Sequence, residues 1–221
     1  MNGIEILDND VWVVANDTHI SQWVKEHGTL ACDPHLFGIM KQWLDIPEVS
    51  TIWDIGANIG DHTIFYLSLG KNVVAIEPNP IAFKCLEHNC PQAILHNIAA
   101  SNESGILSFT QHNNVGASYI GADGTINVSA VCLDSMNLPD PQYVKLDIEG
   151  WEPYAIAGMS ETLKRCKPKV FVEVNKSALA RNKFTYHDVL NPFKELGYSN
   201  YTLFPENSTY DDEQYDVLIT F

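Results

Sequence analysis

The sequence predicts an α/β protein whose mostly parallel, seven-stranded sheet carries helices on both faces, with a small N-terminal hairpin and helices as an extension. From Thr51 onward, apolar runs of strand length alternate with segments of helical spacing, an order that implies a parallel sheet with right-handed crossovers. A turn with two glycines, residues 56–60, joins the first of these strands to the first helix. Two further apolar strands, joined by an acidic loop at residues 205–214, end the chain.

The first 50 residues are expected to form a layer beside the main domain, residues 51–221, so that the whole chain makes one compact domain. Apolar runs at 4–7 and 11–14 flank an Asp-Asn-Asp turn and predict a hairpin. Thr18 is expected to cap a helix that Gly28 ends, and Asp33-Pro34 to open a second helix. A chain of 221 residues with 45% hydrophobic residues can bury one sizeable core.

The main sheet is expected to use seven apolar runs, at residues 52–55, 72–76, 93–98, 143–148, 169–174, 198–204 and 215–221. Helices are predicted to begin near Asp61, Pro80, Pro153, Ser160 and Thr185. Residues 106–111 and 125–132 predict antiparallel strands around a polar, glycine-containing loop at 112–119. Polar loops set between strands often carry binding residues, so this one is a candidate binding loop.

The charge balance argues against a nucleic-acid partner. The chain has 28 acidic and 13 basic residues, a formal net charge of −15, and no cluster of basic residues. Proteins that bind nucleic acids need a positive surface to displace counterions. The five scattered cysteines favour reduced thiols and a cytoplasmic location, and no segment has the length of a membrane span. The first residues lack the basic and then apolar plan of a signal peptide, so none is expected.

The glycine turn predicts a nucleoside site. Residues 54–60 read Asp-Ile-Gly-Ala-Asn-Ile-Gly, and Gly56 and Gly60 let the backbone turn sharply and pass close to a ligand. Glu77 ends the next strand, about 20 residues downstream, where a carboxylate can accept both hydroxyls of a ribose. An acid ahead of the first glycine, Asp54, repels a diphosphate but suits the α-amino group of a methionine moiety. The pattern therefore favours S-adenosylmethionine over NAD.

A second cluster of chemically active side chains follows the strand at 143–148. Lys145, Asp147, Glu149 and Glu152 crowd the carboxyl end of that strand, the edge where open α/β sheets bind ligands. Repulsion among close carboxylates raises a pKa, as a general base near neutral pH requires. The alternative is that Glu149 and Glu152 occupy the first turn of a helix, where the dipole favours acids.

Four motifs together resemble the FkbM-type S-adenosylmethionine-dependent methyltransferases: residues 54–60, Glu-Pro-Asn-Pro at 77–80, Lys-Leu-Asp-Ile-Glu-Gly-Trp-Glu at 145–152 and Glu-Val-Asn at 173–175. The resemblance covers residues 50–175 in order and spacing. It implies the Rossmann-like fold of class I methyltransferases, with an antiparallel strand from the 198–221 region. It also implies O-methylation of hydroxyls on a sugar, a glycan or a small natural product. This family more often has histidine where Asn175 stands, which puts a role for an imidazole there in doubt.

The resemblance assigns site residues one by one. Asp54, Gly56, Asn58 and Gly60 form the loop under the methionine part, Glu77 takes the ribose, Pro78 shapes the turn beside it, and Asn97 is placed near the adenine. Backbone N–H groups of Asp61, His62 and Thr63 could touch the methionine carboxylate, although His62 could equally be a cap residue. Glu149 is the first candidate for the base that deprotonates the acceptor. Asp147 would position acceptor or donor. Lys145 is a lesser candidate for the base, and the favoured interpretation is a strand residue that pairs with a neighbouring acid.

Three functions stay open at this point: a metal-free O-methyltransferase, a magnesium-assisted O-methyltransferase of the catechol type, and a non-catalytic module that binds S-adenosylmethionine. The second would use Asp147, Glu173 and Asn175 as oxygen ligands for Mg²⁺. The sequence carries no signal for the oligomeric state. Candidate residues on the acceptor side are Tyr119, Trp151, Asn175, Tyr186 and the loop 112–118.

Overall fold

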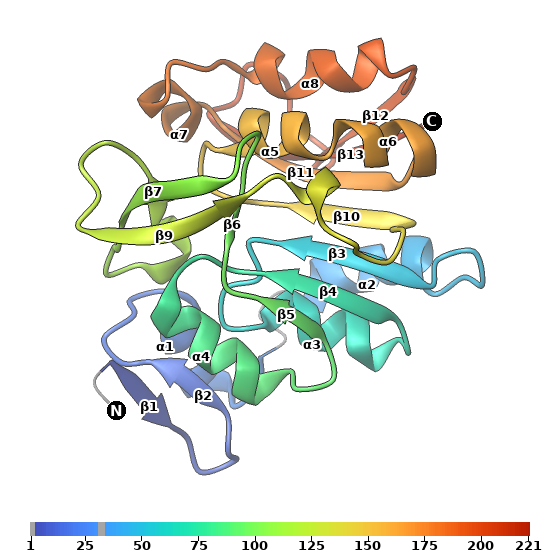
Figure 1. Ribbon diagram of the computed structural model, residues 1–221. Helices are drawn as coiled ribbons and strands as arrows, with labels where there is room; N and C mark the ends of the chain where they lie inside the picture. Colours follow the sequence, from blue (N-terminus) through green and yellow to red (C-terminus); the bar gives the residue numbers. More distant parts are fainter. Residues whose placement is uncertain (1–2, 31–33) are drawn as a thin grey trace.

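One large sheet organises the protein (Figure 1), which the computed structural model describes for residues 3–30 and 34–221. Its strand order is β12-β13-β11-β10-β3-β4-β5. The strands are β3 (Thr51–Ile55), β4 (Asn72–Ile76), β5 (Ile94–His96), β10 (Tyr143–Leu146), β11 (Lys169–Asn175), β12 (Asn200–Phe204) and β13 (Gln214–Thr220). Only β13 runs against the others, because it pairs antiparallel with both β11 and β12. The predicted seven-stranded, mostly parallel sheet is confirmed.

Helices cover both faces of this sheet (Figure 1), because both faces are apolar. On one face, side chains such as Trp53 and Val144 pack under α5 (Glu152–Gly158), α6 (Ser160–Cys166) and α8 (Tyr186–Glu195). On the other face, Ile52 and Tyr143 pack under α2 (Pro34–Leu44), α3 (Asp61–Ser68) and α4 (Pro80–Asn89). Successive strand residues alternate between the two faces, so a buried strand contributes to both layers. Asp33, predicted to open α2, and Cys32 lie outside the described residues.

A second sheet of four strands lies beside the first, in the order β6-β9-β7-β8. It consists of β6 (Ala99–Ala100), β7 (Gly105–Thr110), β8 (Tyr119–Ile120) and β9 (Ile126–Val131), and β7 pairs antiparallel with β9 as predicted. The strand predicted at 93–98 is shorter in the structure, where β5 covers Ile94–His96; β6 follows it and pairs with β9 in the second sheet. The polar loop 112–118 therefore projects from the second sheet, between β7 and β8.

The N-terminal hairpin is confirmed, as β1 (Ile4–Ile6) and β2 (Trp12–Val14), and it rests on α4. The Asn89 side chain there pairs with the backbone N–H and C=O of Trp12, each at 2.9 Å. Helix α1 (Ile20–His27) ends at Gly28, at φ +69°, as predicted. Thr18 does not cap it; the Asp17 carboxylate accepts the N–H of Ser21 instead, at 2.6 Å. The domain boundary at residue 50 stays a prediction.

One helix was not predicted, α7 (Lys176–Arg181), which follows β11 directly. Asn175 caps it by accepting the N–H of Ala178 at 3.1 Å. Among the described residues, no helix is both long and apolar enough to cross a bilayer. Within the same part of the chain, Cys85, Cys90, Cys132 and Cys166 are free thiols.

Candidate active site

A cavity of about 1070 Å³ opens at the carboxyl ends of the central parallel strands. One wall is the loop after β3 together with the ends of β4 and β10, and further lining comes from loop 114–118, from α7 and from residues 18–26. Ligands of open α/β sheets bind at this edge. The cavity therefore lies where the sequence predicts the nucleoside.

Gly56 is essential to the first wall. Its φ is +87°, and a Cβ atom added there would lie 1.8 Å from the backbone oxygen of Asp147. Its N–H donates to the carbonyl of Ile76 at 2.9 Å, so the loop is held between two neighbouring strand ends. Gly60 has a different reason to be glycine. Its φ is +101°, and a Cβ atom there would lie 2.7 Å from Sγ of Cys90, so it allows contact with α4 rather than with a ligand.

The carboxylate of Glu77 is fixed by the backbone on the cavity wall, next to Pro78. It accepts N–H groups from Asn58 at 2.9 Å and from Asn79 at 2.7 Å. Burial raises the pKa of Glu77 to about 7, against the lowering effect of these two hydrogen bonds. Asn97, expected near an adenine, does not line the cavity. Its amide donates to the backbone carbonyl of Glu77 at 2.8 Å and so helps to fix the backbone of that residue.

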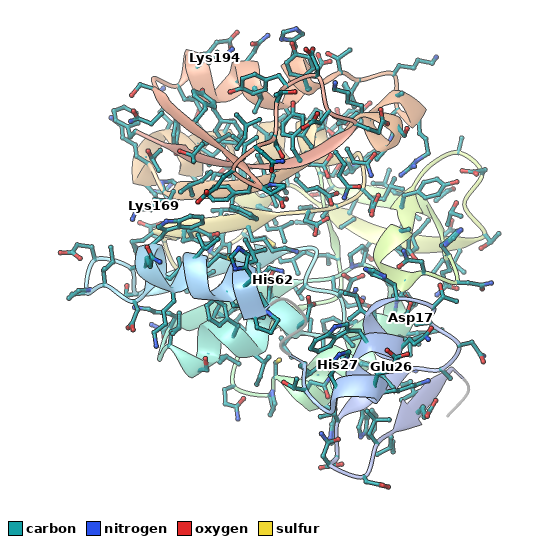
Figure 2. All side chains as sticks on the ribbon, turned by 180° about the vertical axis from the view of Figure 1, so that it is seen from behind. Asp17, Glu26, His27, His62, Lys169 and Lys194 are labelled. Atoms are coloured by element: carbon teal, nitrogen blue, oxygen red, sulfur yellow. The ribbon has the colours of Figure 1, made fainter. Side chains whose placement is uncertain are left out.

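Asp54 and Thr63 are not on the cavity wall, which corrects the expectation that Asp54 meets the ligand directly. Thr63 donates to the Asp54 carboxylate at 2.6 Å, and Asp54 is completely buried. The reason is the alternation of β3, which points Asp54 to the same face as Ile52, under α3. The residues of this region that do line the cavity are Asn58, Asp61 and His62. His62 lies on α3 in Figure 2, and burial lowers its pKa well below the ordinary value.

Lys145 pairs with neighbouring acids, as the sequence favours, and is a poor base. Burial alone would lower its pKa, but the carboxylates of Asp147 and Asp54 raise the pKa above the ordinary lysine value. Its Nζ lies 3.1 Å from the Asp147 carboxylate, 4.0 Å from that of Asp54, and donates to the carbonyl of Gly56 at 3.2 Å. A lysine held charged in this way has no free electron pair. It connects β10 to the glycine loop and balances acidic charge.

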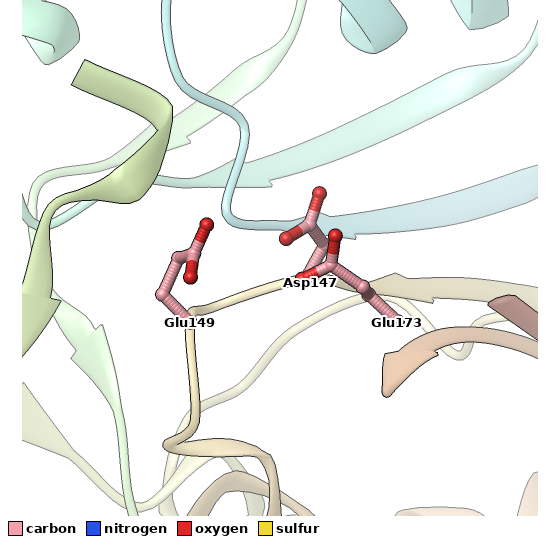
Figure 3. Close-up of side chains that lie close together, drawn as sticks. All are labelled: Asp147, Glu149 and Glu173. Atoms are coloured by element: carbon pink, nitrogen blue, oxygen red, sulfur yellow. The ribbon is translucent and has the colours of Figure 1, made fainter. Parts of the chain in front are cut away.

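Three carboxylates meet beside the cavity (Figure 3): each of Asp147, Glu149 and Glu173 places an oxygen within 4.8 Å of the others. Burial, and next the charge of Asp147, raise the pKa of Glu149 to about 7, while Arg181 lowers it. The pKa of Glu173 is raised well above its ordinary value by burial, then by Asp147 and Glu149. Gln214 donates to one oxygen of Glu173 at 2.7 Å; the other has no partner among the described residues.

Two neighbouring polar residues serve the backbone instead. Glu152 is buried and accepts the N–H groups of Ile148 at 3.0 Å and Gly150 at 3.2 Å, so it braces the turn that carries Glu149. The oxygen of Asn175 is used by the cap of α7, although Asn175 also borders the cavity. If a divalent ion binds, the carboxylate that completes the set with Asp147 and Glu173 is therefore Glu149 rather than the Asn175 amide. The magnesium-assisted reaction itself stays a prediction.

The acceptor side is only partly as expected. Loop residues 114–118 line the cavity, but Tyr119, Trp151 and Tyr186 do not. The rings of these three contact other side chains of the protein: Arg181, Tyr154 and Tyr210, respectively. Several wall residues that the sequence analysis did not assign to the site come from α1 and its approach, from α7 and from β13; among them are Thr18, His19, Trp23, Glu26, Ser177, Arg181 and Gln214.

The N-terminal segment reaches the cavity because it is fixed to the polar loop. Asp17 accepts the N–H of Val115 at 3.0 Å, and the N–H of Thr18 donates to the carbonyl of Asn113 at 3.0 Å. Figure 2 shows Asp17 and Glu26 on this segment, next to the second, four-stranded sheet. For α7, an available signal was the asparagine followed by Lys-Ser-Ala-Leu-Ala-Arg, which is a cap residue before good helix formers.

Comparison with known proteins places this site in a family. The family model described as "Methyltransferase FkbM domain" matches residues 54–199, which contain the glycine loop, Glu77 and the carboxylate cluster. The chain belongs to the FkbM methyltransferase family. This family consists of S-adenosylmethionine-dependent methyltransferases.

Individual relatives agree with this assignment. A hexuronic acid methyltransferase, AglP of Haloferax volcanii, is 32% identical over 127 residues, and the match spans 53% of this chain and 53% of AglP. The crystal structure of an FkbM methyltransferase from Methylobacillus flagellatus has a TM-score of 0.56 at 18% identity, covering 79% of this chain and 44% of that one. A TehB-like S-adenosylmethionine-dependent methyltransferase from Corynebacterium glutamicum has a TM-score of 0.57 at 11% identity, covering 93% and 96%. Both structures show the class I methyltransferase fold.

Proposed function

We propose that this FkbM protein transfers a methyl group from S-adenosylmethionine to a hydroxyl oxygen of a sugar, a glycan or a small natural product. The observation that carries the proposal is the position of Glu149: its carboxyl borders the cavity and has a pKa of about 7. A general base is most effective when its pKa lies near the working pH. The relative AglP, named as a hexuronic acid methyltransferase, supports a sugar acid as one acceptor to test.

The residues of the first wall fit the donor. The loop at Gly56 leaves no room for a side chain, and the Glu77 carboxylate uses only two of about four acceptor positions on backbone N–H groups. It can therefore still accept ribose hydroxyls. The acidic wall, with Asp61 and Asp147 among its members, suits a ligand with a positively charged sulfur and amino group.

The chemistry requires little from the protein besides orientation and proton removal. When bound, S-adenosylmethionine supplies a methyl carbon on sulfur, and the electron pair of the breaking C–S bond stays with the sulfur as the acceptor oxygen bonds to that carbon. Glu149 takes the hydroxyl proton as the oxygen attacks. Asp147, held by Lys145, positions the acceptor or the donor. The two substrates gain from being aligned in one cavity, which can supply a large part of the rate.

A panel of acceptors incubated with methyl-labelled donor tests the proposal. It should contain neutral hexoses, hexuronic acids and phenols, with the products identified by mass shift. The mass alone does not separate an ether from an ester on a uronic carboxylate, so each product is also treated with mild alkali, which cleaves only the ester. An alkali-stable product supports the hydroxyl reaction. Methyl transfer confined to carboxylates would contradict it, because a carboxylate needs no base.

Two alternatives have their own readouts. Activity that disappears with a chelator and returns with Mg²⁺ would favour the metal-assisted reaction, with oxygen ligands from the carboxylate cluster. Binding of S-adenosylhomocysteine without turnover of any acceptor would favour a non-catalytic module. We also propose that no nucleic acid serves as acceptor, given the net charge of −15, and that the protein works in the cytoplasm.

A further inference from the structure

The first residue of α3, Asp61, faces the cavity in the region where the sequence had suggested Asp54. Its side chain is 12% exposed, and it borders the same cavity as Gly56 and Asn58 of the glycine loop. Asp54 is 0% exposed and is bonded to Thr63. Asp61 is therefore the acid of this loop region that a ligand can reach.

The other acids of the cavity wall already have polar contacts. These acids and their contacts are Glu77 with two backbone N–H groups, Asp147 with Lys145, Glu149 with Arg181, Glu173 with Gln214 and Glu26 with Gln22. The Asp61 carboxylate lies 3.9 Å from Nε2 of His62, whose imidazole burial keeps neutral. Lys145 attracts Asp61, but its ammonium contacts Asp147 and the carbonyl of Gly56. Asp61 also accepts a hydrogen bond from its own backbone N–H, and its carboxylate keeps further acceptor positions for an additional cation.

We propose that the carboxylate of Asp61 binds the α-ammonium group of the methionine part of S-adenosylmethionine, an inference that rests on the proposed function. Hydrogen bonds between an ammonium and a carboxylate are about twice as strong as those between neutral groups. In a buried site these hydrogen bonds also replace the hydrogen bonds to water that the Asp61 carboxylate has lost. Asp61 is then a positioning residue: by fixing the amino acid end of the donor, it sets the direction of the sulfur relative to Glu149.

The titration of Asp61 agrees with this role. Burial raises its pKa to about 7, and the charges of Asp54 and Asp147 add to the effect. At a pH below this value, most Asp61 side chains of the ligand-free protein are neutral carboxylic acids. An ammonium group binds the ionised form, so its arrival expels a proton from Asp61.

Calorimetry with two ligands isolates the contact. S-adenosylhomocysteine has the amino acid end, whereas 5′-methylthioadenosine has the same nucleoside and thioether without it. Asp61→Asn should lower the affinity for S-adenosylhomocysteine by about tenfold to a hundredfold. The affinity for 5′-methylthioadenosine should change by less than about twofold. Glu26→Gln, which removes another acid of the same cavity, should leave both affinities unchanged.

A second measurement uses the unchanged protein. The heat of binding is measured at pH 6.5 in two buffers that differ in ionisation enthalpy. Binding of S-adenosylhomocysteine should release protons from the protein, and binding of 5′-methylthioadenosine should release fewer. Equal weakening of both ligands by Asp61→Asn, or an unchanged affinity for S-adenosylhomocysteine, would overturn the assignment of Asp61. If the wild-type protein binds neither ligand, the donor site itself is wrong and the proposed function fails with it.

Discussion

Arg181 holds Glu149 through two contacts: its guanidinium donates to the backbone carbonyl of Glu149 at 3.0 Å and lies 3.7 Å from the carboxylate of the same residue. Glu149 has φ +56°, a conformation that a non-glycine side chain rarely adopts. A positive charge this close lowers the pKa of the carboxyl, against the larger effect of burial. Arg181 of the α7 helix therefore lowers the pKa of the residue that we propose as the base.

Removing this charge should move the pH dependence of the reaction. In Arg181→Gln, the pKa of Glu149 rises further above 7, so the ascending limb of the rate against pH shifts to higher pH. Arg181→Lys keeps a positive charge and should shift the limb less. The measurement is kcat/KM between pH 5.5 and 9 for both variants. A profile that stays in place in Arg181→Gln would show that the two residues are not coupled in the reaction.

Glu149→Gln should lower kcat by about a hundredfold to ten-thousandfold, the usual contribution of a positioned base. With a pKa of about 7, the wild-type base is protonated and inactive at low pH, so the rate should be half-maximal near pH 7 and level off at higher pH. The variant should lack this limb while its affinity for S-adenosylhomocysteine remains. Glu161→Gln, an exposed acid in α6, serves as the control. Nearly full activity in Glu149→Gln would exclude it as the base.

The glycine loop can be tested by a matched pair of substitutions. Gly56→Ala places a Cβ atom 1.8 Å from the carbonyl of Asp147, whereas Gly70→Ala, at a similar φ of +71°, meets nothing within 4 Å. Gly70→Ala should cost only about 1–2 kcal/mol, the strain of left-handed backbone. Gly56→Ala should cost several times more, or abolish folding. Thermal unfolding of both variants compares them, and equal losses would mean that the contact with Asp147 does not matter.

The buried acids should make the ligand-free protein less stable at pH 8 than at pH 5.5. Burial raises the pKa of Asp61, Glu77, Glu149 and Glu152 to about 7, from about 4 in the unfolded chain. Between these values the folded state binds more protons than the unfolded state, so the free energy of unfolding falls as pH rises. The lowered pKa values of His62 and His96 act in the opposite direction, at fewer sites. The midpoint of thermal unfolding, measured between pH 5.5 and pH 8, tests this prediction. A higher midpoint at pH 8 than at pH 5.5 would contradict it.

Most of the fold was readable from the sequence because its central strands are buried on both faces. Runs such as residues 73–76 and 170–172 are continuous and apolar, a pattern typical of strands buried on both faces. Short elements were less readable. The six residues of α7 have too few apolar positions to show a period, and β6 is a strand only because β9 lies beside it.

The sequence predicted those cavity residues whose place depends on backbone position alone. Gly56, Glu77 and Glu149 end or follow strands, and strand ends meet at one edge of a sheet. Side-chain direction was the harder question. Spacing did not show that Asp54 turns under α3 while Asp61 turns into the cavity, nor that Trp23 of α1 would line the same cavity. That last contact depends on hydrogen bonds between residues 17–18 and 113–115, nearly a hundred positions apart.

The origin of the outer wall has a consequence for how this enzyme could diversify. The family match begins at residue 54, and residues 18–26, which border the cavity through Trp23 and Glu26, lie before it. Part of the cavity wall thus comes from outside the stretch that carries the family motifs. Substitutions at Trp23 or Glu26 would change this part of the wall and leave the residues of the family match unchanged. Exchanging residues 18–26 among homologues offers a practical route to new selectivities.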